Sequence, residues 1–89
     1  MAKFDGIMGM GWPKISAGNE TPVFMKMFQQ GLVGSDSYAF YLSQVPGSSG
    51  SEMTLGGVDN SKAAAPFNYY PLVQESYWMI NLDSFTVGG

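Results

Sequence analysis

The chain has 89 residues, a formal net charge of −3 and 45% apolar residues, which fits one small domain with ample material for a core. With only four Lys and Arg residues, a nucleic-acid-binding surface is excluded as its main function. The absence of His and Cys excludes disulfides, cysteine-zinc sites and thiolate nucleophiles, so chemistry would depend on carboxylates, hydroxyls or backbone groups.

The first predicted element is a short buried strand at Ile7 and Met8, which lies between two glycines and ends in a tight turn. Before it, Asp5 and Gly6 interrupt the apolar residues at once, so we expect no signal peptide at residues 1–4. No apolar run approaches the roughly 18 residues of a membrane span, so no transmembrane helix is expected. Residues 12–21, rich in Ser, Gly, Pro and Asn, are predicted to form a loop.

A short helix is predicted to follow this loop. Thr21 is a suitable N-cap, Pro22 suits the first helical position, and Gly31 can end the helix in a left-handed conformation. The apolar residues of the helix share one face, which is typical of core packing far more often than of a binding stripe. These residues are Val23, Phe24, Met27 and Phe28.

The rest of the chain is predicted to be mainly β. Residues 38–43 and 52–55 alternate between apolar and polar side chains around a flexible turn at 45–51, which predicts a hairpin. Gly56 and Gly57 end that pattern. Further β-rich runs lie at residues 67–70, 77–82 and 85–87. The expected fold class is therefore mainly β with one short α-helix.

The acidic residues show no pattern that would pair two of them. Two carboxylates held close together can share a proton and act as an acid/base pair. Because the sequence gives no reason to pair any two, we interpret these side chains as solvated or turn-capping acids. They are Asp5, Glu20, Asp36, Glu52, Asp59, Glu75 and Asp83.

The glycines of the opening segment allow two interpretations. Gly6, Gly9 and Gly11 have the spacing G-x-x-G-x-G, which reverses the dinucleotide-binding fingerprint, and no strand-turn-helix pattern surrounds them. Packing of a tight β turn is favoured over a phosphate-binding loop. Phe4 and Trp12 bracket this segment, so they could line a groove or belong to a core, and both interpretations stay open.

Asn19-Glu20-Thr21 matches the N-x-[ST] pattern for glycosylation, which matters only in the secretory route. Thr21 is better explained as the cap of the helix, and Pro22 directly after it disfavours glycosylation. The occupancy of Asn19 is left open.

Seven sequence blocks occur in a fixed order along the chain. They are AKFDGIMGMG at 2–11, TPVF at 21–24, QGLV at 30–33, FYLS at 40–43, EMTLGGVD at 52–59, YW at 77–78 and LD at 82–83. In this order they resemble the pepsin-like aspartic proteases, closest to the cathepsin D and vacuolar or parasite branch. The resemblance covers essentially the whole chain, and the shared order of the blocks is much more specific than any single block.

This resemblance implies a bilobal acid protease fold in which each lobe supplies one Asp from an Asp-Thr/Ser-Gly motif. The two Asp residues share a proton and activate a water that attacks a peptide carbonyl, without metal or cofactor. The chain contains neither Asp-Thr-Gly nor Asp-Ser-Gly. By the family pattern it begins after the first catalytic Asp and the flap and ends before the second. We therefore expect no catalytic residue in it, no cofactor and no metal.

The resemblance also predicts a division of the chain. Residues 1–56 are expected to be the C-terminal part of the N-terminal lobe, residues 57–76 the crossing strands between the lobes, and residues 77–89 the start of the C-terminal lobe. Residues 60–66 depart from the family pattern, so their local course is left open.

Two groups of residues match functional positions of the family. Ile7, Met8 and Gly9 match the element that braces the loop carrying the catalytic Asp. Phe4 and Ile7 match positions that line the pocket for the substrate side chain just before the scissile bond. Asp5 matches no catalytic position and is interpreted as a structural acid.

The leading hypothesis is a segment of a pepsin-like aspartic endopeptidase that supplies cleft and scaffold residues and is inactive alone. The alternative is a non-catalytic binding or self-association module of the same fold, favoured by the apolar content and open strand edges. An unrelated small β domain is disfavoured by the block order. Expected partners are a peptide or protein substrate and the remaining lobe segments of the protease, with no nucleic acid or membrane. The parent enzyme is expected to be secretory, lysosomal or vacuolar, or extracellular, although this chain shows no targeting signal.

Overall fold

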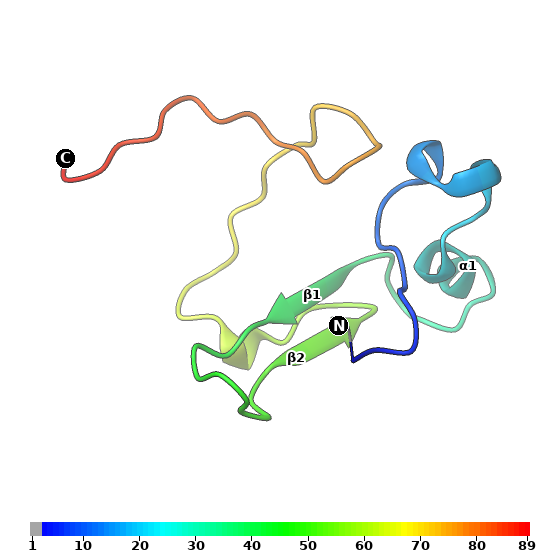
Figure 1. Ribbon diagram of the computed structural model, residues 1–89, viewed down its shortest axis with the longest axis horizontal. Helices are drawn as coiled ribbons and strands as arrows, with labels where there is room; N and C mark the ends of the chain where they lie inside the picture. Colours follow the sequence, from blue (N-terminus) through cyan, green and yellow to red (C-terminus); the bar gives the residue numbers. More distant parts are fainter. Residues whose placement is uncertain (1–2) are drawn as a thin grey trace. The chain divides into compact units, whose positions relative to one another are not determined.

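The computed structural model describes residues 3–89. Met1 and Ala2, which belong to the first family block and to the segment where no signal peptide is expected, lie outside the described residues. The described chain divides into two compact units, one of residues 3–23 and 69–89 and the other of residues 24–68 (Figure 1). No helix in the described range 3–89 is long and apolar enough to cross a membrane.

The second unit contains the predicted hairpin, formed by the antiparallel strands β1 (Tyr38–Tyr41) and β2 (Glu52–Leu55) (Figure 1). The register places Phe40 opposite Met53, an apolar cross-strand pair of the kind that stabilises a two-stranded sheet. In the turn between the strands, Gly47 has a φ of 73°. The hairpin prediction is confirmed, although β1 ends at Tyr41 rather than at residue 43.

The predicted helix is α1 (Val23–Gln29), which begins one residue after Pro22. Gly31 has a φ of 73°, its N–H donates to the Phe28 carbonyl at 3.0 Å, and the Leu32 N–H donates to the Met27 carbonyl at 2.9 Å. This pair of hydrogen bonds is a Schellman motif. The prediction that Gly31 ends the helix in a left-handed conformation is therefore confirmed.

The apolar stripe of α1 is buried at only one position. Phe24 is 7% exposed, and its ring lies edge-on to Tyr38 of β1 with centroids 5.0 Å apart. Val23 and Phe28, predicted to share this buried face, are 51% and 42% exposed. The prediction of a continuous core stripe is wrong for these two, because among the described apolar residues only Phe24 is buried.

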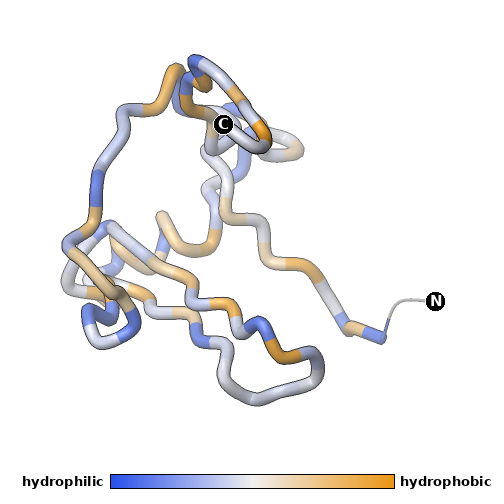
Figure 2. Tube along the Cα trace, turned by 90° about the vertical axis from the view of Figure 1, so that its left-hand side faces the viewer, coloured by the Kyte–Doolittle hydropathy of each residue, from blue (hydrophilic) through white to orange (hydrophobic). Residues whose placement is uncertain are grey.

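The remaining predicted strands are absent from residues 3–89. Ile7 and Met8, expected to form a buried strand, have no regular structure and are 85% and 44% exposed. The β-rich runs at 67–70, 77–82 and 85–87 are likewise irregular. A strand requires a second backbone to exchange hydrogen bonds with, and no described segment pairs with these runs. Figure 2 shows apolar residues, in orange, recurring along the trace. Among the described residues, however, Phe24 is the one buried apolar side chain.

Short 3-10 turns occur in the predicted loop at residues 12–21 and in the segment 60–66, whose course the sequence does not predict. In the first unit η1 (Pro13–Ile15) and η2 (Ala17–Asn19) lie within the predicted loop. In the second unit η3 (Asn60–Lys62) gives a local course to the segment that departs from the family pattern, and the Lys62 Nζ lies 5.2 Å from the centroid of the Tyr41 ring. The small sheet and the short α-helix agree with the mainly β class.

Candidate functional site

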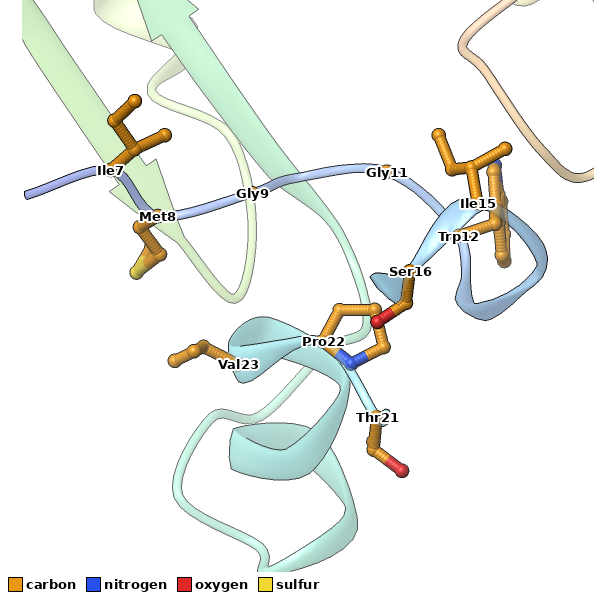
Figure 3. Close-up of a pocket in the computed structure, with 10 residues that line it drawn as sticks. All are labelled: Ile7, Met8, Gly9, Gly11, Trp12, Ile15, Ser16, Thr21, Pro22 and Val23. Carbon is orange, nitrogen blue, oxygen red and sulfur yellow. The ribbon is translucent and has the colours of Figure 1, made fainter. Parts of the chain in front are cut away.

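The first unit contains a pocket of about 260 Å³ that is lined entirely by residues from the range 7–23. This volume is slightly below the roughly 300–1,000 Å³ typical of small-molecule sites. Figure 3 shows the side chains of Ile7 and Met8 on opposite sides of the backbone, as expected for an extended segment. Trp12 and Ile15 lie together further along the lining.

Several of the residues singled out in the opening segment line this pocket. Ile7, Met8 and Gly9, the expected bracing element, all line it, and so does Trp12. Phe4, the other residue expected to contact substrate, is 61% exposed and does not line the pocket. Of the two residues expected to contact substrate, only Ile7, which also belongs to the bracing element, lines the pocket.

A contact that the sequence gave no reason to expect lies next to the pocket. The Trp78 indole Nε1–H donates to the Met10 carbonyl at 2.6 Å, and the Trp12 backbone N–H donates to the Ser76 carbonyl at 3.1 Å. The two indole rings lie with centroids 5.5 Å apart at an angle of 38°. We call this arrangement of residues 10–12 and 76–78 the tryptophan clasp. No local pattern links segments so far apart in sequence.

Gly11 packs closely against Ile15 within its own side of the clasp and is in ordinary van der Waals distance of Ser76 on the other side. A Cβ added at this position would lie 2.8 Å from the Ile15 Cδ1 and 3.5 Å from the Ser76 carbonyl oxygen. Two polar atoms at the clasp are buried without a hydrogen-bond partner among the described residues, the Trp12 Nε1 and the Ser76 Oγ. Ser76 is only 3% exposed, so its hydroxyl carries the full cost of lost hydration.

None of the acidic residues lines the pocket. Asp5 is exposed at the start of the first unit. Residues 3–89 contain no group of three or more His, Cys, Asp or Glu side chains that could hold a metal ion.

Asp59 is the acid with a perturbed environment. It caps η3, and the Ser61 hydroxyl bonded to it lowers its pKa, with smaller contributions in the same direction from Glu52, the Ser61 backbone N–H and the Lys62 charge. The structure thereby brings Glu52 near Asp59, a pairing that the sequence did not indicate. A lowered pKa keeps the Asp59 carboxylate ionised, which suits a turn cap and not a general acid.

The glycosylation motif lies on the surface of the first unit. Asn19 is exposed at the end of η2 with a φ of 56°, and Thr21 is exposed just before α1. The structure gives Asn19 access to solvent and leaves its modification a matter for experiment.

Comparison with known proteins agrees with the sequence blocks. The model of the family described as eukaryotic aspartyl protease matches residues 1–89. The chain is 46% identical to cathepsin E from Cavia porcellus over 87 residues, 98% of this chain and 22% of that protein. It is 43% identical to cathepsin D from Dictyostelium discoideum over 88 residues, 99% of this chain and 23% of that protein. It is 47% identical to pepsin A from Sus scrofa over 88 residues, with the same coverage of 99% and 23%.

The chain thus spans less than a quarter of the length of these relatives. The family match extends over every residue, which confirms the resemblance to cathepsin D and pepsin that the sequence blocks indicated. This chain belongs to the eukaryotic aspartyl protease family.

Proposed function

We propose that this chain is a central segment of a pepsin-like aspartic endopeptidase and has no proteolytic activity by itself. The observation that carries the proposal is the family match over residues 1–89 in a chain that covers only 22–23% of the relatives. The absence of any Asp-Thr-Gly or Asp-Ser-Gly motif supports it. In the complete enzyme two Asp residues from outside this sequence activate the water that hydrolyses the peptide bond.

Within that enzyme we assign residues 1–56 to the end of the N-terminal lobe, residues 57–76 to the crossing between lobes and residues 77–89 to the start of the C-terminal lobe. The order of the sequence blocks supports this division. The irregular, exposed course of the β-rich runs after residue 66 also supports it. Apart from Trp78, and from the Met79 carbonyl, which accepts from the Val73 N–H, their backbone groups are available to pair with strands supplied by the rest of the protease.

We assign Phe4 and Ile7 to the substrate cleft and Ile7, Met8 and Gly9 to the support of the catalytic loop. Ile7 is 85% exposed and lines the pocket, so its side chain is accessible to a substrate side chain. No backbone hydrogen bond joins residues 7–9 to another described segment. Their N–H and C=O groups can therefore pair with the loop that they are proposed to brace.

The proposed partners are a peptide or protein substrate and the other lobe segments of the same protease. The proposed route of the parent enzyme is secretory, leading to a lysosome or vacuole or to the extracellular space. This assignment rests on the family to which the chain belongs.

A second function, a non-catalytic module that self-associates, is favoured by one observation. Large apolar side chains such as Leu82, Phe85 and Val87 are 76%, 81% and 87% exposed, and within residues 3–89 the strands β1 and β2 pair only with each other. Sedimentation of the isolated chain tests this function. Defined oligomers support it, and a folded monomer at high micromolar concentration contradicts it.

The leading proposal is tested by exchanging segments between proteases. In Cavia porcellus cathepsin E, the matching 87 residues are replaced by this chain, and cleavage of a protein substrate is measured at acidic pH. We expect the chimera to cleave and to be blocked by pepstatin. A control chimera with the same residues in scrambled order should be inactive. A folded chimera without activity would contradict the proposal.

A further inference from the structure

We propose that Trp78 is a positioning residue of this protease, which fixes the bracing element through the carbonyl of Met10. The inference rests on the proposed function of Ile7, Met8 and Gly9, and it adds a residue to which that function had assigned no role. Trp78 lies in the part of the chain assigned to the other lobe. It therefore connects the bracing element of one lobe to the start of the second.

The hydrogen bond between Trp78 and Met10 is short and joins distant parts of the sequence. The donor Nε1 and the carbonyl oxygen are 2.6 Å apart, slightly shorter than the usual range of about 2.7–3.2 Å for N–H···O bonds, and the two residues are 68 positions apart. Met10 directly follows Gly9, the last residue of the bracing element. The Met10 carbonyl thus lies only one residue from the bracing element, so a displacement of this carbonyl is expected to shift the backbone of Gly9.

Both sides of the clasp are held by short turns. On one side the Val73 N–H donates to the Met79 carbonyl at 3.0 Å, which closes the turn that carries Trp78. On the other side the Ile15 N–H donates to the Trp12 carbonyl at 3.2 Å, which closes η1. The Trp12 N–H to Ser76 carbonyl bond joins the two turns. The carbonyl of Met10 is therefore held against a locally ordered turn and not against a free strand.

The two tryptophans of the clasp differ in a way that can be tested. The indole N–H of Trp78 is bonded to Met10, whereas the indole N–H of Trp12 is buried with no partner in residues 3–89. Replacement of either residue by Phe keeps an aromatic ring, but only Trp78→Phe removes a hydrogen bond to the segment next to the bracing element. A positioning role thus predicts unequal effects from two chemically identical substitutions.

The test uses the complete protease that carries this segment, or the cathepsin E chimera described above. Because Trp78 is 57% exposed, loss of its hydrogen bond is worth about 0.5–1.5 kcal/mol, which corresponds to a kcat decrease of roughly twofold to tenfold if it acts on the geometry of the transition state. For Trp78→Phe we expect this decrease with KM changed by less than about twofold, together with a shift in the pH dependence of kcat. Trp12→Phe should give a smaller loss, and Ser49→Ala, at an exposed serine of the hairpin turn outside the clasp, should leave kcat unchanged.

A second variant separates loss of the hydrogen bond from misfolding caused by a smaller side chain. Replacement of Trp78 by 3-benzothienylalanine keeps the size and shape of the indole but removes the N–H donor, and it should reproduce the decrease in kcat. Equal kcat for Trp78→Phe and Trp12→Phe, or a change confined to the thermal midpoint, would overturn the inference while the proposed function stands. An inactive parent enzyme would instead overturn the proposed function, and the inference with it.

Discussion

The carboxylate of Asp59 accepts two hydrogen bonds from Ser61, one from the backbone N–H at 3.0 Å and one from the hydroxyl at 2.6 Å. Both bonds favour the ionised form and lower the pKa of Asp59 from its ordinary value of 3.8. Because the pKa in the folded state is the lower one, the contribution of Asp59 to stability is present above that ordinary value. It is lost as the pH falls through the lowered pKa.

Ser61→Ala is therefore expected to raise the pKa of Asp59 toward 3.8, since the hydroxyl is the largest cause of the shift. Lys62→Gln, which removes the weakest contribution, should raise it less. Carboxyl carbon chemical shifts followed by NMR through an acid titration measure both values. A larger rise of the Asp59 pKa in Lys62→Gln than in Ser61→Ala would show that the Lys62 charge, and not the Ser61 hydroxyl, is the main cause of the lowered pKa.

Gly56 and Gly57 differ in their tolerance of a side chain. Gly56 has a φ of 84°, and a Cβ there would lie 3.1 Å from the Val33 Cβ, whereas a Cβ on Gly57 meets nothing within 4 Å. We expect Gly56→Ala to lower the free energy of unfolding by about 1–3 kcal/mol. Gly57→Ala should change it by less than about 0.5 kcal/mol. Urea unfolding of the full-length protease measures both variants. Equal losses of unfolding free energy would contradict the argument that the positive φ and close Val33 contact make Gly56 intolerant of a side chain.

The buried hydroxyl of Ser76 has no partner in the described chain, so its removal should be favourable. Ser76→Ala is expected to raise the free energy of unfolding by about 1 kcal/mol, because the alanine has no polar group to desolvate. Ser49→Ala, at an exposed serine in the hairpin turn, is the control and should stay within about 0.5 kcal/mol of the parent. Destabilisation by Ser76→Ala would indicate that the hydroxyl is satisfied in the complete protease.

Ile7→Ala should change substrate selection and not stability. Ile7 is 85% exposed, so truncation leaves no cavity in the described chain. Under the proposed assignment of Ile7 to the substrate cleft, truncation removes apolar contact with the substrate side chain before the scissile bond. For peptides with a large apolar residue at that position we expect kcat/KM to fall by about 10-fold to 100-fold. Val87→Ala, at an 87% exposed residue, is the control. An equal fall for peptides with a small residue there would argue against direct contact.

Features that depend on neighbouring residues could be predicted from the sequence. The hairpin follows from alternation on both sides of a flexible turn, and the end of α1 follows from the backbone freedom of Gly31. Both are complete within a few residues of chain, so the structure reproduces them closely.

Features that need a distant partner could not be predicted in the same way. Ile7 and Met8 have strand-forming side chains, but a strand exists only where another backbone pairs with it, and no described segment does so. The contact of Trp78 with Met10 had no local signal, because it joins residues 68 positions apart. The family resemblance, in contrast, followed from the order of the blocks and not from any single contact.

The central claim is that this segment supports catalytic carboxylates without containing them. The most direct test compares, at acidic pH, cleavage of a protein substrate by the rigorously purified 89-residue chain and by the cathepsin E chimera. We predict pepstatin-sensitive cleavage by the chimera and none by the chain alone. Pepstatin-sensitive cleavage by the isolated chain would contradict the claim.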